Sequence, residues 1–463
     1  MTARPGPTWQ QRLAAAIGGY PWDAVFLSMM LVLLIVLLGS FAVDAAWTAY
    51  WQSTGQPDYA RFRGTCYWMG DCRTLIRIAA NGYTDYDALT GQRHLTLLPD
   101  RSWWPLYVNL TALALRLTGG DYCSGWLVNL IAMTLLPPVI QGITGTRRPS
   151  LMTGIALMPF GAWLYAGMAE GLFLLLSGAL LWLSLRRPSP RWRARVLWGF
   201  LALLLGTLVG LTKPNALALI PGFGLLALAR TVRHLEAASA GDAPDSPRSR
   251  PKLRRAFDDT NPGWAAVLAA IGLLLGLGLW FYQTSGYYPL YVLMAQRTLW
   301  FKQFNSGDPL ALASYLMQGW WTAVTGAGLP GQRPSVMIHF AALNLMAVLI
   351  VRDLPPRWPG ADRPRLTPLY ATASMLTVLA TMFATGQAHA VQRYLIGNVF
   401  FAVAFLRYVY GDADEPPLAD LPRLVRQRGG YALRALLRLT VLACSLLLLI
   451  IEAIVIVMSG NRV

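Results

Sequence analysis

Charged residues are scarce in this chain. Asp, Glu, Lys and Arg make up 13% of its 463 residues, whereas hydrophobic residues make up 55%. This balance excludes an ordinary soluble globule, in which about a quarter of the residues are charged. Repeated apolar runs of about 17–25 residues predict an all-α polytopic membrane protein with about eleven transmembrane helices. We expect residues 1–463 to form a single integral membrane domain.

Acidic residues and lysine are both few. The chain has 39 basic residues, 22 acidic residues and a net charge of +17, and only Lys213, Lys252 and Lys302 are lysines. This bias towards arginine suggests a bacterial origin. A charge of +17 also fits nucleic-acid binding, but the arginines gather between hydrophobic runs, as in cytoplasmic loops. We expect a multi-pass protein of the cell inner membrane that contacts lipids and no nucleic acid.

Cysteine and histidine are rare, with four residues of each. No cluster of His, Cys and carboxylate residues has the spacing of metal ligands, so we predict no metal and no cofactor. Cys66 and Cys72 both fall in the predicted first outer loop, where thiols can be oxidised. We therefore expect a disulfide between these two residues, with Cys123 and Cys444 unpaired.

Arginine-rich connections predict the direction of each span. Arg4 and Arg12 keep the N-terminus inside, and the polar residues before the first span do not resemble a cleavable signal peptide. The spans are expected over 24–46, 124–143, 150–167, 169–185, 196–211, 214–230, 264–284, 334–351, 367–386, 391–409 and 436–458. The apolar run from 105 to about 118 fits either a span or a re-entrant or interfacial helix. Only a helix that does not span keeps the later arginines inside, so we predict that this run does not span.

Three long connections separate the spans. Residues 47–103 are expected to form the first outer, periplasmic loop, which carries amphipathic helices. Residues 285–333 are expected to form a second outer loop. The Arg-, Pro- and Ser-rich segment 231–262 has the composition of a flexible cytoplasmic linker.

An acid in the first outer loop precedes a short amphipathic segment. After Asp71, the residues Cys72, Leu75, Ile76 and Ala79 share one face at helical spacing. Such a helix would lie along the bilayer surface and hold the acid near the headgroups. From the residues alone, Asp71 fits a helix N-cap as well as a functional acid.

Several polar residues gather on the predicted outer face, namely Asp71, Glu170, Lys213, His389 and Arg393. Glu170 also fits a helix N-terminus that the macrodipole favours. Lys213 and Arg393 also fit basic side chains that reach towards lipid headgroups. The convergence of these residues on one side favours a site for an anionic, hydroxyl-bearing substrate at the membrane edge.

Five short motifs follow one another along the chain. They are Asp71 with Gly82-Tyr83 eleven residues later, Trp103-Trp104-Pro105-Leu106-Tyr107, Ala169-Glu170-Gly171-Leu172-Phe173, Thr212-Lys213-Pro214-Asn215-Ala216 and Arg393-Tyr394. In kind and order they resemble the motifs of the PIG-V type of GT-C-fold mannosyltransferases, which add the second mannose to the GPI core, and of their bacterial relatives. The chain departs from the family where Lys213 replaces Arg and Ala216 replaces Gly, and where Met69-Gly70 separates Trp68 from the acid.

This resemblance implies a GT-C glycosyltransferase fold. It also implies transfer of a sugar, mannose in this family, from a polyprenyl-phosphate donor to a glycan or glycolipid acceptor outside the membrane. An alcohol needs a carboxylate to accept its proton as it attacks the anomeric carbon. We assign this general-base role to Asp71, in a single displacement that inverts the anomeric centre.

The remaining candidates contact the substrates. Arg393, Lys213 and His389 are candidates for stabilising the donor phosphate, and Glu170 is a candidate for orienting the acceptor. The aromatic candidates for sugar or lipid contact are Trp103, Trp104, Tyr107 and Tyr394, although tryptophans also form interfacial belts.

Two other functions use the same outer cations. A transporter or flippase of a lipid-linked sugar would grip a phosphate and need no base. A polymerase or ligase of lipid-linked glycans would use a diphosphate-linked oligosaccharide. The large outer loops and the lack of an internal repeat favour the transferase over the transporter.

Overall fold

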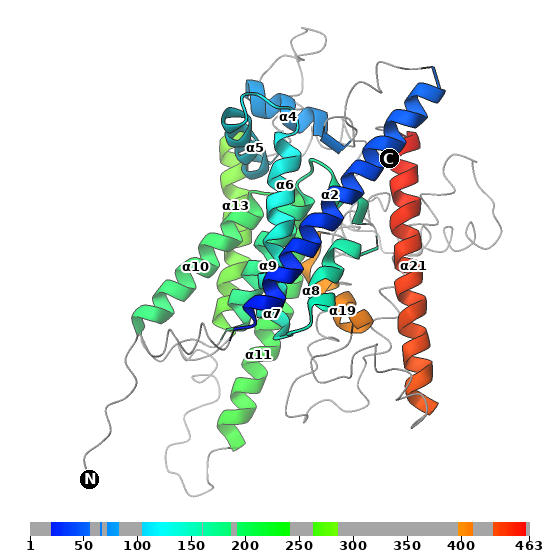
Figure 1. Cartoon of the computed structure of the whole chain (residues 1–463). Helices are drawn as coiled ribbons and strands as arrows, with labels where there is room; N and C mark the ends of the chain where they lie inside the picture. Colours follow the sequence, from blue (N-terminus) through cyan, green and yellow to red (C-terminus); the bar gives the residue numbers. More distant parts are fainter. Residues whose placement is uncertain are drawn as a thin grey trace, which may run out of the picture.

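The described parts of the chain are helical and contain no strand. The computed structural model describes residues 20–55, 65–66, 72–82, 104–159, 161–186, 192–240, 263–285, 397–410 and 429–459. The α-helices are α2 (Trp22–Ser53), α4 (Cys72–Asn81), α5 (Pro105–Leu117), α6 (Ser124–Thr134), α7 (Leu136–Thr144), α8 (Pro149–Thr153), α9 (Glu170–Leu185), α10 (Trp192–Gly210), α11 (Ile220–Ala240), α13 (Trp264–Ser285), α19 (Val399–Tyr410) and α21 (Gly429–Ser459). The 3₁₀ helices are η3 (Gly154–Leu157), η4 (Gly161–Tyr165) and η5 (Pro214–Leu219). The long helices form a bundle with α4 and α5 at one end, which we call the α4–α5 end (Figure 1).

Three stretches of helix are long and apolar enough to cross a membrane. They are Trp22–Ser53, Ser124–Thr144 (α6 and α7 together) and Trp192–Gly210. They agree with the spans expected over 24–46, 124–143 and 196–211. The expected count of about eleven spans stays a prediction, and residues 334–351 and 367–386 lie outside the described part.

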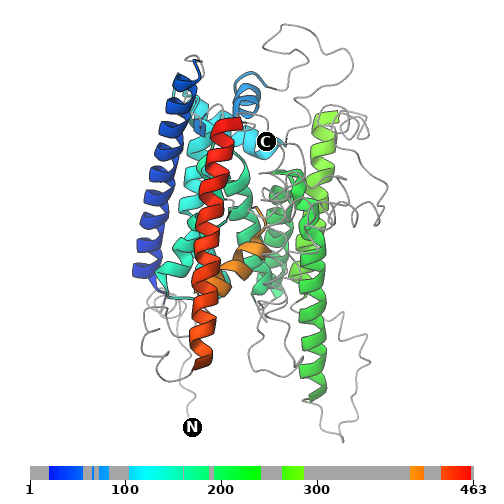
Figure 2. The same ribbon diagram turned by 90° about the vertical axis from the view of Figure 1, so that its right-hand side faces the viewer.

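The long helices alternate in direction. α2, α10, α13 and α21 finish at the α4–α5 end, whereas α6, α9 and η5–α11 begin there (Figure 2). At the opposite end, Arg230 donates hydrogen bonds to the carbonyls of Ser184 and Arg186, and Arg193 lies in the first turn of α10. The alternation of these directions agrees with the prediction, and Arg186, Arg193 and Arg230 gather at the end opposite α4 and α5.

Helix α5 is too short to cross a bilayer. Its 13 residues extend about 20 Å, against about 30 Å of hydrocarbon. This agrees with the prediction that the apolar run from 105 does not span. Two other helices run further than expected: α2 continues to Ser53, past the predicted start of the outer loop at 47, and α11 continues to Ala240, into the predicted linker.

Residues 150–167 lead the chain back towards the α4–α5 end, as expected, but they do not form the single transmembrane helix that was predicted. Here the chain forms the short helix α8 and the 3₁₀ helices η3 and η4, and nearly all of its described residues are buried. Irregular backbone is tolerated at membrane depth where protein surrounds it and satisfies its polar groups. Asn129 Nδ2 donates to the carbonyls of Leu164 (2.7 Å) and Ala166 (3.0 Å), and Ser40 Oγ donates to the carbonyl of Tyr165 (2.8 Å). Hydropathy alone cannot separate such a buried segment from a lipid-facing helix.

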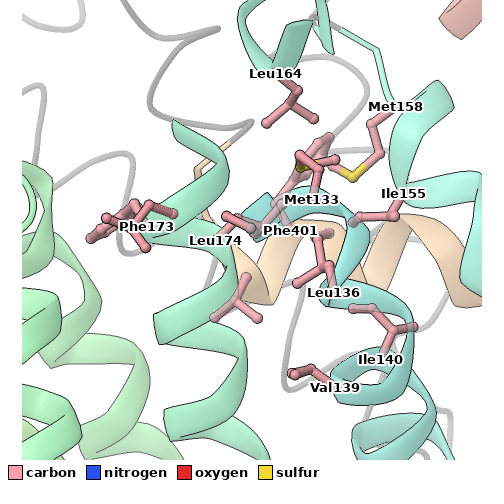
Figure 3. Packing of buried hydrophobic residues seen from close by; sticks show 14 of the residues in the cluster. Met133, Leu136, Val139, Ile140, Ile155, Met158, Leu164, Phe173, Leu174 and Phe401 are labelled. Carbon is pink, nitrogen blue, oxygen red and sulfur yellow. The ribbon is translucent and has the colours of Figure 1, made fainter. Parts of the chain in front are cut away.

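Apolar side chains from α6, α7, α9 and α19 fill the centre of the bundle (Figure 3). Met133, Leu136, Leu174 and Phe401 are fully buried there. In a bilayer, close van der Waals packing of such side chains holds helices together, because lipid tails are as apolar as the core. This core holds α9 in place, and α9 carries one of the candidate residues at its first position.

Helices α10 and α13 touch through glycines. A Cβ atom added to Gly206 would lie 2.9 Å from Gly272 Cα, and one added to Gly210 would lie 2.9 Å from Gly276 Cα. Within each helix the two glycines are four residues apart, which is the small-xxx-small spacing that lets helices in membranes approach closely. The contact fixes the end of α10, from which the chain continues to Lys213.

We expect Gly272→Ala to destabilise the protein by about 1–3 kcal/mol, because its methyl group would push against the α10 backbone. Gly278→Ala on the same helix is the matched control, since a Cβ atom there meets nothing within 4 Å. Thermal unfolding midpoints in one detergent compare the two. Equal midpoints would show that this glycine contact does not hold the helices together.

Candidate active site

A buried ion pair joins two of the predicted site residues. Glu170 is the first residue of α9, and Lys213 lies in the turn between α10 and η5. Lys213 Nζ lies 2.5 Å from Glu170 Oε1, and the side chains are 12% and 0% exposed respectively. A carboxylate is favoured at a helix N-terminus, but its full burial also requires a close cation. The structure therefore couples the two residues directly.

The start of α5 holds the turn that carries Lys213. The Leu106 N–H donates to the carbonyl of Leu211 over 3.0 Å. Trp104 stacks on Trp280 of α13, with 4.1 Å between the ring centroids. The Trp104 indole nitrogen is buried and has no hydrogen-bond partner among the described residues, although a buried indole N–H usually has one. The predicted Trp104 motif thus lies beside the Lys213 turn.

Tyr107 lies between the starts of α4 and α9. Its hydroxyl donates to the carbonyl of Gly125 over 2.8 Å. Burial raises the pKa of the Tyr107 phenol well above its usual range, and the nearby Cys72 and Glu170 side chains raise it further. The phenol therefore stays protonated at physiological pH and keeps its hydrogen bond. Its predicted contact with substrate stays a prediction.

The dipeptide Thr65–Cys66 connects several elements at this end. Asp44 Oδ1 on α2 accepts hydrogen bonds from the Thr65 N–H and from the Thr65 hydroxyl, each over 2.8 Å. The Thr65 carbonyl accepts the Gly167 N–H over 2.7 Å and faces Cys72 Sγ at 3.9 Å. Asp44, which is 8% exposed, was missed at the level of sequence. The available signal was an acid within the apolar run of the first span.

The predicted Cys66–Cys72 disulfide is wrong. Cys66 is bonded to Cys123, with 4.6 Å between the Cα atoms, and Cys72 is a buried free thiol. Cys72 lies on the buried face of α4. Cys123 lies just before α6, where Gly125 and Gly167 let the chains approach closely: a Cβ atom on Gly167 would lie 3.4 Å from the Gly125 carbonyl carbon. The pairing therefore depends on tertiary packing and not on nearness in sequence.

Helix α4 has the predicted amphipathic character. Cys72, Leu75 and Ile76 are buried, as expected, and Ile78 is buried as well. Asp71 immediately precedes this helix but lies outside the described residues. The other predicted site residues outside them are Trp103, His389, Arg393 and Tyr394. No group of three or more His, Cys, Asp or Glu side chains suited to a metal occurs in the part of the chain that the structure describes.

No protein-family model matches this chain, and no curated protein matches its sequence. Among solved structures, the chain is similar to an oligosaccharyltransferase from Archaeoglobus fulgidus, which was tethered through a disulfide to an acceptor peptide containing the NVT sequon. The identity is 11% and the TM-score 0.40, over 96% of this chain and 55% of that chain. This chain therefore spans about half the length of that protein. So distant a likeness identifies neither a family nor an activity.

We expect Cys66→Ser and Cys123→Ser to lower stability equally, by about 2–4 kcal/mol, because each opens the same loop. Cys72→Ser is the matched control and should leave the disulfide intact. Peptide mapping by mass spectrometry without reduction identifies the linked pair. A peptide linking Cys66 to Cys72 would contradict the structure.

The ion pair gives a second test. Lys213→Met should cost about 3–5 kcal/mol, because it leaves the Glu170 carboxylate buried without its nearest cation. Adding Glu170→Gln to the same chain should restore more than half of that loss. Unfolding of both single variants and the double variant measures the coupling. Simply additive losses would show that the two side chains are independent.

Proposed function

We propose that this chain is a membrane glycosyltransferase of the GT-C type, which transfers mannose from a polyprenyl-phosphate carrier to an acceptor hydroxyl. The observation that carries the proposal is the contact between Glu170 and Lys213, which belong to separate predicted motifs. The motif at Trp104 adjoins the same turn, and α4 starts directly after Asp71. The described parts of three motifs, at Trp104, Glu170 and Lys213, thus lie close together.

Lys213 is the proposed contact for the donor phosphate. An ammonium group carries three donors and can contact a carboxylate and a phosphate oxygen together. In the buried pair, Glu170 fixes the direction of Lys213, so we now assign it this orienting role ahead of acceptor positioning. Arg393 and His389 are proposed to complete the phosphate site. Such fixed charges stabilise the leaving phosphate in the transition state.

Asp71 is the proposed general base. The acceptor oxygen attacks the anomeric carbon and forms the new glycosidic bond, while the bond from that carbon to the phosphate oxygen breaks. The acceptor proton passes to Asp71, and polyprenyl phosphate leaves. One displacement inverts the anomeric centre. The buried Trp104 indole is a proposed donor to a sugar hydroxyl. The site would face the periplasm if the opposite end, with Arg186, Arg193 and Arg230, is cytoplasmic.

The purified protein in liposomes should transfer radiolabelled mannose from mannosyl polyprenyl phosphate to a lipid extract. We expect Asp71→Asn to slow this transfer by about 100-fold or more, because the amide cannot accept the proton. Asp23→Asn, an exposed acid at the far end of α2, is the matched control and should transfer normally.

The same liposomes separate the alternative functions. A flippase would move the labelled donor across the bilayer without forming product, and Asp71→Asn would keep most of this flux. A ligase would accept only a diphosphate-linked oligosaccharide. Either result would overturn the proposed function.

A further inference from the structure

Asp44 is an acid in an apolar helix, with only 8% of its surface exposed. About 33 Å of helix separate it from Trp22, which places it near the rim at the α4–α5 end. A carboxylate in such a position requires hydrogen-bond donors. Thr65 supplies two of them, and both go to the same oxygen of Asp44. The acid therefore fixes both the backbone and the side chain of Thr65.

Thr65 also contacts the start of α4 and the segment before α9. Its N–H faces Asp44, while its carbonyl accepts the Gly167 N–H and faces the Cys72 thiol. Thr65 and the following Cys66 are fully buried, and Cys66 is covalently bonded to Cys123. One short segment thus holds α2, the start of α4, the start of α6 and the chain leading into α9.

The two residues that the Thr65 carbonyl contacts, Cys72 and Gly167, both lie near proposed catalytic groups in the sequence. Cys72 directly follows Asp71, the proposed base. Gly167 precedes Glu170 by three residues, and Glu170 forms the ion pair with Lys213. The start of α4 and the chain leading to the Glu170–Lys213 pair are therefore both held through Thr65. A displacement of about 1 Å between reacting groups can slow a reaction about 100-fold.

We propose that Asp44 is a positioning residue for the transfer reaction, acting through Thr65 to hold the start of α4 and the chain before Glu170 in place. This inference rests on the proposed function. Asp44 is not itself the base, because it is buried and the oxygen facing Thr65 already accepts two hydrogen bonds. The Cys66–Cys123 bond holds the segment to α6 independently, so removal of the acid should loosen the site without unfolding the bundle.

Steady-state transfer by the full-length protein in liposomes tests this role. Asp44→Asn keeps an oxygen that accepts both Thr65 hydrogen bonds, so its kcat should stay within about threefold of the wild type. Asp44→Val removes the acceptor, and its kcat should fall by about tenfold or more while KM for the donor changes little. Asp23→Val, at an exposed position of the same helix, is the matched control.

Two results would overturn the proposal. Asp44→Asn as inactive as Asp71→Asn would make Asp44 a catalytic acid or base. Asp44→Val with a normal kcat would show that the contact positions nothing. Thr65→Val, which removes only the hydroxyl donor, should give an intermediate loss in kcat.

Hydrogen exchange provides a test that does not depend on activity. Peptides covering α4 and residues 161–170 should exchange faster in Asp44→Val but not in Asp44→Asn. Unchanged exchange in both variants would show that Asp44 does not hold α4 and residues 161–170 in place. If the wild type transfers no sugar, the proposed function fails, while the exchange result still decides whether Asp44 holds these two segments together.

Discussion

The Glu170 carboxylate is fully buried among apolar helices, where an uncompensated charge costs several kcal/mol. This cost ties the start of α9 to the turn that carries Lys213. The turn is held in its place by the α5 hydrogen bond and by the glycine contact between α10 and α13. One electrostatic requirement thus couples helices that are distant in sequence. Because Glu170 needs a cation, the Lys213 ammonium group stays at a fixed position at the α4–α5 end. A fixed ammonium group can recognise a phosphate.

A second constraint is the need to satisfy backbone polar groups away from water. The segment between α8 and α9 is irregular and buried, so its carbonyls require donors from neighbouring helices. Asn129 and Ser40 supply such donors, and Thr65 accepts the N–H of Gly167. Because Asp44 in turn holds Thr65, the polar contacts form a continuous connection from α2 to α9. The site end of the bundle is therefore more polar and more cross-linked than the apolar core beneath it.

Local patterns predicted some of this structure well. The buried face of α4 and the alternating helix directions follow from helical periodicity and from arginine bias, which need no tertiary information. The break between residues 150 and 167 was missed because hydropathy does not distinguish lipid from protein as the surroundings. The partner of Cys66 was missed because it depends on a close approach of Gly125 and Gly167. Asp44 was overlooked within an apolar run, although an acid there is itself a functional signal.

The position of the donor phosphate shows whether the Glu170–Lys213 pair is the phosphate site. Electron cryomicroscopy of the protein in lipid nanodiscs with bound polyprenyl monophosphate, the proposed leaving group, would locate it. We expect a phosphate oxygen about 3 Å from Lys213 Nζ, with that ammonium still held by Glu170. A phosphate bound at the opposite end, near Arg193 and Arg230 and away from the ion pair, would contradict this site.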